Sequence, residues 1–239
     1  MCSDAVANPS VSRNVRTERG WQVITESGSV DELHGLSDPV NAARTVRIML
    51  PTAPAIALGS SQSMEEVDMD RAREEGLSVS KRRSGGGAVL IVPGEHLWLD
   101  FLVPRGDPLW DDDIVAAANW VGELWAVTLE SSGFEKTSVH HGRSLHTTWS
   151  RAVCFAGVGP GEVLASGRKV MGLSQRRSRD WTRIQTLIHR VWRPETLVGS
   201  LAMDPEIRRA CLAEVTDLVA SFEFDGAALA REMLTNLPD

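Results

Sequence analysis

The sequence predicts an α+β fold in which helices flank a central sheet that is mixed or largely antiparallel. Two observations carry this prediction. Short apolar segments separated by Gly-rich turns follow one another through the second half of the chain, whereas helical periodicity is confined to separate segments elsewhere. The regular strand–helix alternation of a doubly wound parallel sheet is missing. A length of 239 residues suits one domain with a full core, and we expect residues 19–239 to form it.

Charge and composition narrow the classes of protein to consider. Hydrophobic residues make up 42% and charged residues 24% of the chain, and the net charge is -7. This acidic balance argues against general binding to nucleic acid or to an anionic membrane surface. Three widely spaced cysteines, Cys2, Cys154 and Cys211, give neither a disulfide framework nor a metal pair. With no signal peptide or membrane span in the sequence, we expect a soluble, cytoplasmic protein.

The first third of the chain predicts a tail followed by strands and helices. Residues 1–18 are polar without periodicity, and we expect a disordered tail there. A short strand follows at residues 21–24. Apolar residues recur every three or four positions through residues 30–50, which predicts a helix. Residues 55–58 are typical of a buried strand, and residues 67–75 of a further helix.

The middle of the chain predicts two strands joined by a glycine turn, then another strand and a long helix. Residues 77–83 and 88–92 are the two joined strands, and residues 96–103 alternate apolar and polar side chains as a strand does. Asp111-Asp112-Asp113 opens the clearest helical pattern, which ends near Gly133. Carboxylates at this position stabilise the positive end of the helix dipole, and we interpret them as a cap rather than a metal site.

The C-terminal part of the chain predicts a run of strands and then terminal helices. Gly-rich turns separate five short apolar segments, and helical periodicity returns after them. The five predicted strands cover residues 139–144, 152–155, 162–165, 169–175 and 182–192. The two predicted helices cover residues 205–220 and 226–234.

A loop in the middle of the chain has the composition of an anion-binding site. Its residues are Arg82-Arg83-Ser84-Gly85-Gly86-Gly87-Ala88-Val89. Consecutive glycines weaken regular structure and are kept where the backbone needs a positive φ or where another group comes close. Backbone N–H groups beside guanidinium groups suit a phosphate or a carboxylate. An ordinary glycine hairpin explains the same residues equally well, so both interpretations stay open on this stretch alone.

A second glycine-containing stretch places a lysine on a strand. It is Ser166-Gly167-Arg168-Lys169-Val170-Met171-Gly172-Leu173-Ser174-Gln175-Arg176-Arg177. Three of the 25 basic residues are lysines, so a lysine here indicates a position that needs a compact ammonium group. Gly172 allows another group to approach the strand closely. The alternative is a surface lysine in a hairpin.

Together the two stretches resemble the lipoate-protein ligase family, within the biotin/lipoate protein ligase superfamily. The order and separation of the Arg-Arg-Ser-Gly-Gly-Gly loop and the Gly-Arg-Lys-Val-x-Gly hairpin carry the resemblance. Weaker agreement extends to Leu58-Gly59-Ser60-Ser61-Gln62 and to Cys154-Phe155, so that the resemblance covers residues 50–195. It implies a biotin/lipoate ligase (class II synthetase-like) catalytic domain that includes the C-terminal helices and lacks a large accessory domain.

The resemblance implies an ATP-dependent activity. Such a ligase activates lipoate or octanoate as an acyl-adenylate, with magnesium accompanying the ATP. It then transfers the acyl group to a lysine of a lipoyl domain in a 2-oxoacid dehydrogenase complex or of the glycine cleavage H protein. Lys169 would be catalytic, because an ammonium group stabilises charge as the carboxylate meets the α-phosphate. The nucleotide and acyl group would be held by Arg82, Arg83, Ser84, Gly85, Gly86, Gly87, Ala88, Val89, Leu90, Gly172 and Ser174.

The sequence departs from the family after the glycine loop. An aromatic residue and a His-Asp pair are usual there, whereas this chain has Leu90-Ile91-Val92-Pro93-Gly94-Glu95. Ser174 replaces the usual alanine of the hairpin motif. The Gly-Arg-Gly-Arg loop of biotin ligases is missing, which favours lipoate or octanoate over biotin. A degenerate homologue that binds an acyl-adenylate without turnover therefore remains an alternative.

A competing enzymatic hypothesis rests on Cys154. Some members of the superfamily are octanoyltransferases or amidotransferases that use no ATP and carry the acyl group on a cysteine near this position. A thiolate next to an ammonium group is a suitable nucleophile for a thioester. The apolar neighbours of Cys154 favour the alternative, a buried strand cysteine. The basic residues at positions 176–183 suggest either nucleic-acid binding or, as we prefer at this net charge, a docking patch for an acidic lipoyl domain.

Overall fold

The computed structural model describes residues 12–39, 41–134 and 136–239, and within these the strands form two sheets. The large sheet, in spatial order, contains β1 (Ser12–Glu18), β2 (Trp21–Gly28), β3 (Thr45–Pro51), β7 (His96–Pro104), β11 (Trp181–His189), β10 (Arg168–Arg177), β9 (Val163–Ala165) and β8 (Thr137–Val139). The small sheet contains β5 (Ser78–Lys81), β4 (Ala55–Leu58) and β6 (Val89–Ile91). Only β2–β3 and β4–β5 among these pairs are parallel. The predicted α+β class with a mixed, largely antiparallel sheet is confirmed.

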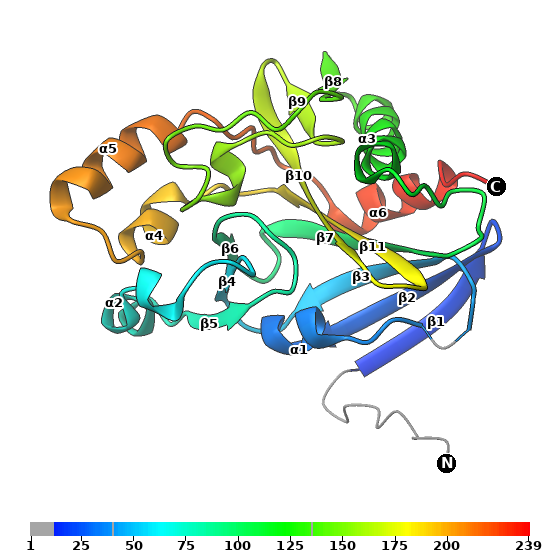
Figure 1. The fold of residues 1–239 in the computed structure, drawn as a ribbon, viewed down its shortest axis with the longest axis horizontal. Helices are drawn as coiled ribbons and strands as arrows, with labels where there is room; N and C mark the ends of the chain where they lie inside the picture. Colours follow the sequence, from blue (N-terminus) through cyan, green and yellow to red (C-terminus); the bar gives the residue numbers. More distant parts are fainter. Residues whose placement is uncertain (1–11, 40, 135) are drawn as a thin grey trace.

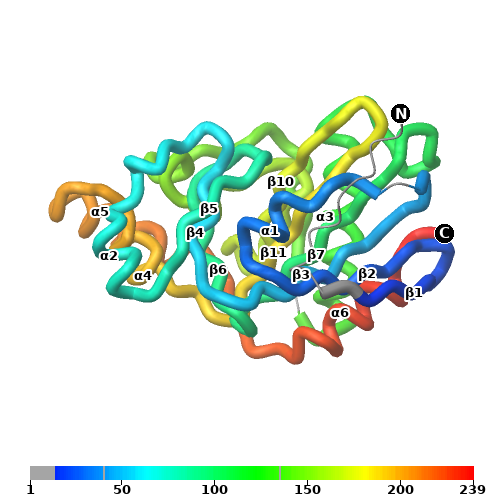
Figure 2. Tube along the Cα trace, turned by 90° about the horizontal axis from the view of Figure 1, so that it is seen from below, coloured from blue at the N-terminus to red at the C-terminus, as the bar shows by residue number. Residues whose placement is uncertain are grey.

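The helices lie in two groups (Figure 1). The longest, α3 (Ile114–Ser131), packs with α6 (Gly226–Thr235) on one face of the large sheet. The others are α1 (Val30–Gly35), η1 (Met64–Glu66), α2 (Met69–Glu74), η2 (Cys154–Ala156), α4 (Pro194–Gly199) and α5 (Pro205–Val215). Of these, α2, α4 and α5 gather at the end of the molecule beside the small sheet, as the tube view from below also shows (Figure 2). No helix of the described residues has the length and apolarity needed to cross a membrane.

Strand β7 shows how the large sheet separates two cores. Successive side chains of a strand point to opposite faces. Leu97, Leu99 and Phe101 join the core beneath α3 and α6, on what we call the helix face. Trp98 points the other way and packs with Val89 of the small sheet, on what we call the small-sheet face. The chemistry described below lies on the small-sheet face.

The aspartates before α3 act as a helix cap. The Asp113 carboxylate accepts hydrogen bonds from the backbone N–H groups of Val115 and Ala116, at 2.7 and 3.2 Å. These two N–H groups belong to the first turn, where the helix supplies no acceptor of its own. The predicted capping role is therefore confirmed for Asp113.

Two segments differ from the sequence predictions because backbone pairing overrides their local patterns. Residues 12–18, part of the predicted disordered tail, form β1 and pair with residues 21–27 of β2. Residues 1–11 of that predicted tail lie outside the described residues. The predicted helix at 30–50 ends at Gly35, and β3 follows, hydrogen-bonded between β2 and β7. The β-branched side chains of β3 fit a pleated sheet better than a helix.

The glycine loop is a crossover and not a hairpin. Strands β5 and β6 lie on opposite sides of β4, so the loop that joins them passes over the end of β4. At Gly59, just after β4, a Cβ atom would lie 1.8 Å from the carbonyl oxygen of Gly86. Gly86 itself has φ +98°, which favours glycine. The expected strand at 152–155 is replaced by the 3₁₀ turn η2, because the chain bends there around this loop.

Candidate active site

A narrow, mainly apolar cavity of about 50 Å³ lies between the large sheet and the small sheet. It draws its walls from both sheets, the glycine loop, η2 and α1. The lining residues are His34, Ala57, Arg82, Val89, Ile91, Trp98, Cys154, Phe155, Gly172, Leu173, Ser174, Gln185, Thr186 and Leu187. The cavity therefore joins residues from both motifs that the sequence singled out.

The glycine loop packs directly on Cys154. Ala88 N donates to Ala152 O at 2.9 Å, and Cys154 N donates to Ala88 O at 3.0 Å. A Cβ atom at Gly87 would lie 2.8 Å from Cys154 N, and one at Gly86 would lie 3.1 Å from its Sγ. The glycines are thus required by the close approach of the cysteine turn to the loop.

Arg82 holds the loop closed from inside. Its side chain is 4% exposed, and it donates from Nη1 to Ala57 O and from Nη2 to Gly85 O and Gly87 O, at 2.8–2.9 Å. Nη2 also lies 3.7 Å from Cys154 Sγ. Among the described residues, no carboxylate pairs with Arg82 in an ion pair. Its positive charge therefore faces backbone carbonyls and the cysteine sulfur.

Lys169 lies directly behind the cysteine turn, buried to 2% exposure. Its ammonium group lies 2.7 Å from Glu162 Oε2 and donates to Gly157 O at 2.9 Å and to Cys154 O at 3.2 Å. An ammonium group has three N–H donors, so these oxygens use all of them. Glu162 in turn accepts from the backbone N–H groups of Gly159 and Leu173. The lysine thereby ties the turn that carries Cys154 to β10.

Phe155 fills the space between Lys169 and the sheet. The lysine Nζ lies 4.7 Å from the centroid of the Phe155 ring, a cation–π distance. At Gly172 a Cβ atom would lie 2.6 Å from this ring and 3.3 Å from Lys169 Cε. Any larger residue at position 172 would displace the ring or the lysine, which explains the glycine in the strand.

A buried polar network forms one side of the cavity. Ser84 Oγ lies 3.0 Å from Ser174 Oγ and donates to Gln185 Oε1 at 3.1 Å. Gln185 Nε2 lies 3.4 Å from His34 Nδ1 and 3.4 Å from an oxygen of Asp100. The two hydroxyl groups link the glycine loop to β10 and fix the width of the cavity at its polar side.

An ion pair between Asp100 and Arg183 adjoins this network through Gln185. Arg183 Nε donates to Asp100 Oδ2 at 2.6 Å, and its terminal nitrogens donate to carbonyls at the end of α1. Burial, together with the charges of Arg183 and Arg82, lowers the pKa of His34 to about 3. His34 is therefore neutral at physiological pH, and its Nε2 is buried without a hydrogen-bond partner.

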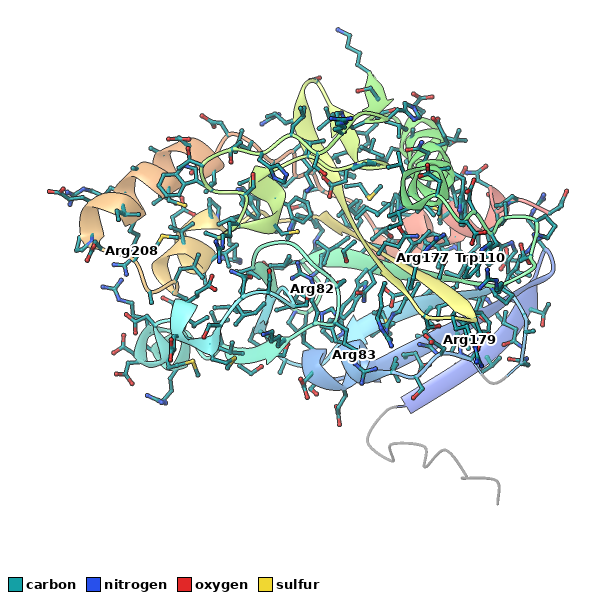
Figure 3. All side chains as sticks on the ribbon, viewed as in Figure 1. Arg82, Arg83, Trp110, Arg177, Arg179 and Arg208 are labelled. Atoms are coloured by element: carbon teal, nitrogen blue, oxygen red, sulfur yellow. The ribbon has the colours of Figure 1, made fainter. Side chains whose placement is uncertain are left out.

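The structure brings most of the sequence-predicted site residues together, though not all of them. Arg82, Val89, Gly172, Ser174 and Cys154 line the cavity, and Ser84, Gly85, Gly86, Gly87, Ala88 and Lys169 lie against its walls. Arg83 is exposed and points away from Arg82 (Figure 3), and Leu90 packs into the core beside α4 and α5. The functional roles predicted for these residues remain predictions.

Three polar residues of the site were missed by the sequence analysis. Glu162, His34 and Gln185 come from three separate elements, and each is buried in the fold. Glu162 had a weak signal, since a carboxylate stands between a Gly-Pro-Gly turn and an apolar strand. His34 and Gln185 had none, because their meeting depends on α1 packing against β11.

The family of this protein follows from a family model that matches most of the chain. A model of the lipoyl protein ligase A/B catalytic domain matches residues 33–221. The chain belongs to this family. The match contains both motifs, the cysteine turn and the whole cavity, and it begins within α1. The family includes lipoate ligases and octanoyltransferases, which are enzymes of lipoyl or octanoyl transfer.

Two curated relatives are octanoyltransferases named LipM. The one from Clostridioides difficile (strain 630) is 27% identical over 134 residues, which are 56% of this chain and 49% of the relative. The one from Moorella thermoacetica is 31% identical over 142 residues, which are 56% of this chain and 48% of the relative. The chain spans about half the length of the curated relatives it matches.

Solved structures of lipoate-protein ligases share the fold. A bipartite lipoate protein ligase from Thermoplasma acidophilum, studied with its E2 lipoyl domain, superposes with a TM-score of 0.64 at 15% identity, over 86% of this chain and 74% of that chain. Lipoate-protein ligase A bound with ATP superposes with a TM-score of 0.55 at 18% identity, over 86% of this chain and 87% of that chain. The fold predicted from the two motifs is thereby confirmed.

Proposed function

We propose that this protein is an ATP-independent octanoyltransferase that carries the acyl group on Cys154. The observation that carries the proposal is the position of the thiol. Cys154 lines the cavity between the sheets, and its Sγ lies 3.7 Å from a buried guanidinium nitrogen of Arg82. The guanidinium group thus faces the sulfur, and the thiolate is the nucleophilic form of a cysteine. The similarity to octanoyltransferases named LipM supports the same activity.

The reaction proceeds in two balanced steps. In the first, the Cys154 thiolate attacks the carbonyl carbon of a medium-chain acyl thioester, a new C–S bond forms, and the donor's thiolate leaves and takes up a proton. In the second, the amine of an acceptor lysine attacks the Cys154 thioester. An amide bond forms, the C–S bond breaks, and the sulfur takes the proton that the amine releases. Both steps need a thiol that is accessible and held next to a positive charge.

In this proposal Lys169 positions the nucleophile. All three of its donors are engaged by Glu162 and by two carbonyls of the cysteine turn, one of them Cys154 O. An α-phosphate would have to displace one of these partners to reach the ammonium group. The arrangement therefore fits a lysine that holds the turn better than one that binds a nucleotide.

The proposed acceptor is a lysine of a lipoyl domain, and the glycine cleavage H protein is a second candidate acceptor. The T. acidophilum neighbour has an E2 lipoyl domain as its partner in the lipoylation system. In the present chain, the basic tip of the β10–β11 hairpin provides a surface for an acidic partner. There Arg177 stacks on Trp110 with 5.1 Å between its guanidinium carbon and the ring centroid (Figure 3).

The second candidate function is the ATP-dependent lipoate ligase. It is favoured by the likeness of the fold to lipoate-protein ligase A bound with ATP and by the presence of both the glycine loop and the lysine hairpin. In this alternative, Arg82 and the loop would hold ATP with magnesium. Lys169 would first have to leave Glu162.

One assay separates the two functions. The purified protein is incubated with a lipoyl domain and either octanoyl-carrier protein without ATP or octanoate with ATP and magnesium, and both proteins are then weighed by mass spectrometry. The transferase predicts acylation from the thioester alone and a transient octanoyl adduct on the enzyme. The Cys154→Ala variant should form neither product, while the Cys211→Ala variant, whose thiol is buried in the core, should keep both.

The opposite pattern would refute the proposal. If the Cys154→Ala variant acylates the lipoyl domain with octanoate and ATP as well as the unmodified protein does, the enzyme is a ligase. If neither donor leads to acylation while the protein still binds octanoyl-adenylate, the protein is the degenerate homologue.

A further inference from the structure

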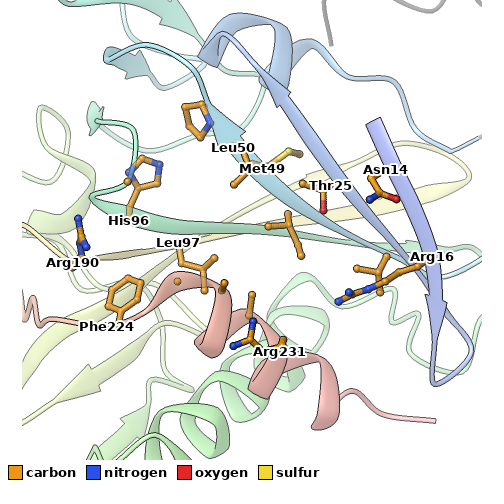
Figure 4. Close-up of a pocket in the computed structure, with 17 residues that line it drawn as sticks. Asn14, Arg16, Thr25, Met49, Leu50, His96, Leu97, Arg190, Phe224 and Arg231 are labelled. Atoms are coloured by element: carbon orange, nitrogen blue, oxygen red, sulfur yellow. The ribbon is translucent and has the colours of Figure 1, made fainter. Parts of the chain in front are cut away.

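A second and larger cavity lies on the helix face of the large sheet (Figure 4). It has a volume of about 470 Å³ and runs between α6 and strands β1, β2, β3 and β7. Sites for small molecules typically enclose about 300–1,000 Å³. The cavity between the sheets is far below this range, whereas this one falls within it. We refer to it as the arginine groove.

Three arginines from separate parts of the chain line the arginine groove. They are Arg16 of β1, Arg190 just after β11 and Arg231 of α6. No aspartate or glutamate is among the lining residues, although the chain as a whole carries a net charge of -7. The groove therefore concentrates positive charge on an acidic protein, and it attracts anions.

Within the described part of the chain, the ion pairs of Glu95 and Glu18 leave Arg190 and Arg231 without an acidic partner. Glu95 pairs with Arg193 through two contacts of 2.6 Å, and Arg193 with Arg190 lowers the pKa of this carboxyl. Glu18 pairs with Arg16 at 3.5 Å on the surface. Among the described residues, the side chains of Arg190 and Arg231 make no hydrogen bond or ion pair. Arg190 Nε is buried without a partner, which is costly unless a ligand satisfies it.

The floor of the arginine groove is apolar. Val23, Ile48, Leu97 and Ala230 are among its lining residues, and Phe224 stands near Arg190 at one end (Figure 4). Figure 4 places Arg190 and Arg16 toward opposite ends, with Arg231 between them in this view. Guanidinium groups spread along the groove suit a ligand that carries more than one negative group.

We propose that the arginine groove binds an organic molecule that joins an apolar chain to more than one phosphate group. Guanidinium groups bind phosphate through two parallel hydrogen bonds, and the apolar floor accepts the chain. The groove lies on the opposite face of the large sheet from Cys154 and shares no lining residue with the cavity between the sheets. The proposal is therefore independent of the reaction assigned to Cys154.

Calorimetric titration with octanoyl-CoA tests the proposal. The titration uses the Cys154→Ala protein, so that no acyl group is transferred to the enzyme. Adding Arg190→Gln and Arg231→Gln should remove one binding site or weaken it by about tenfold or more, because two charge-assisted contacts are lost. The control adds Arg73→Gln and Arg209→Gln, which remove the same charge from exposed positions outside the groove and should leave the titration unchanged.

Two further ligands test the chemical class. Inorganic phosphate and octanoate each contain one part of the proposed ligand, and each should bind at least about tenfold more weakly than octanoyl-CoA. The proposal is overturned if phosphate alone binds as tightly, if the groove variant titrates like its parent, or if the control variant loses binding equally. With Cys154 intact, the Arg190→Gln/Arg231→Gln variant should transfer acyl groups at the unmodified rate, and loss of transfer would place the arginines at the reaction instead.

Discussion

Two buried cations flank Cys154, and they differ in how their charge is balanced. Lys169 forms an ion pair with Glu162, and both side chains are almost fully buried. Arg82 is buried to a similar degree, but within the described part of the chain it forms no ion pair and contacts only carbonyl oxygens and the cysteine sulfur. The first cation belongs to a neutral pair, and the second presents a net charge to the cavity.

Because of this difference, we expect Lys169 and Arg82 to have different roles, although the sequence places both in one site. A buried neutral pair fixes a backbone turn and adds little field at a distance. An uncompensated guanidinium group stabilises negative charge on a nearby sulfur or on a bound acyl oxygen. We therefore expect loss of Lys169 to act mainly through the fold, and loss of Arg82 to lower the rate of the reaction as well as to loosen the loop.

The largest effect is expected on stability from Lys169→Met. Removing the lysine leaves the Glu162 carboxylate buried without its cation, and breaking such a pair costs about 3–5 kcal/mol. Urea denaturation at pH 7 should show this loss in the free energy of unfolding. The double variant Lys169→Met/Glu162→Gln removes both charges and should recover at least about 2 kcal/mol of it. A double variant no more stable than the single one would show that the ion pair is not the cause.

Arg82→Gln should affect mainly the rate of acyl transfer. Loss of one preorganised donor to a developing charge commonly lowers kcat by about 10²–10³. We expect this range for the rate at which octanoyl groups reach a lipoyl domain, with a smaller effect on KM. The adjacent Arg83 is exposed and provides the matched control, because Arg83→Gln changes the same charge outside the cavity. Equal losses in the two variants would contradict the role assigned to Arg82.

The sequence predicted the two motifs and their meeting, but not the balance of charges. Arg82, Cys154 and Lys169 lie in segments with strong local patterns, so their proximity followed from the family resemblance. Glu162 decides what Lys169 can do, and no pattern around it marks an ion pair that forms only when β9 and β10 are placed side by side. Glu162 precedes β9, and its pairing with Lys169 depends on the β9–β10 register, which shifts between Lys169 and Met171 in a way that the alternation of side chains does not predict.

Fold predictions failed where pairing partners were distant in the sequence. The apolar spacing of residues 45–50 fits a helix or a strand, and the sequence predicts a helix there. Hydrogen bonds to β2 and β7 stabilise the strand β3 instead. An ordinary hairpin is one of the two interpretations that the sequence leaves open for the glycine loop, because strands joined by a short turn usually pair. Here β4 occupies the position between them. Strands β7, β10 and β11 were predicted close to their observed bounds because turn residues such as Pro93-Gly94 and Gly167 bound them, although β7 pairs with β3 and β11 far away in the sequence.

Substituting one of two glycines places an extra methyl group beside one cation and not the other. Gly172→Ala would place Cβ 2.6 Å from the Phe155 ring, next to Lys169, and Gly86→Ala would place it 2.9 Å from Arg82 Nη2. Overpacking of this kind costs about 1–3 kcal/mol. Gly172→Ala should lower the free energy of unfolding, and Gly86→Ala, which also has φ +98°, should lower both stability and acyl transfer. Gly199→Ala has open space around it and serves as the control; a similar loss there would refute the crowding explanation.

Stability should also fall in mild acid, because one histidine beside each cation is buried in its neutral form. Burial lowers the pKa of His189 to about 3, helped by His96 and Lys169, and it lowers that of His34 to about 3, helped by Arg183 and Arg82. Each is neutral in the folded protein, whereas in the unfolded chain it binds a proton below about pH 6.5.

Stability therefore falls as the pH drops below that value, by about 2 kcal/mol for each histidine at pH 5. Denaturant midpoints at pH 7 and pH 5 measure the fall, and His189→Phe or His34→Gln should each reduce it by about that amount. If either variant loses as much stability between pH 7 and pH 5 as the unmodified protein, the corresponding histidine does not titrate on unfolding in that range, and the field of its neighbouring cation has no part in the acid sensitivity.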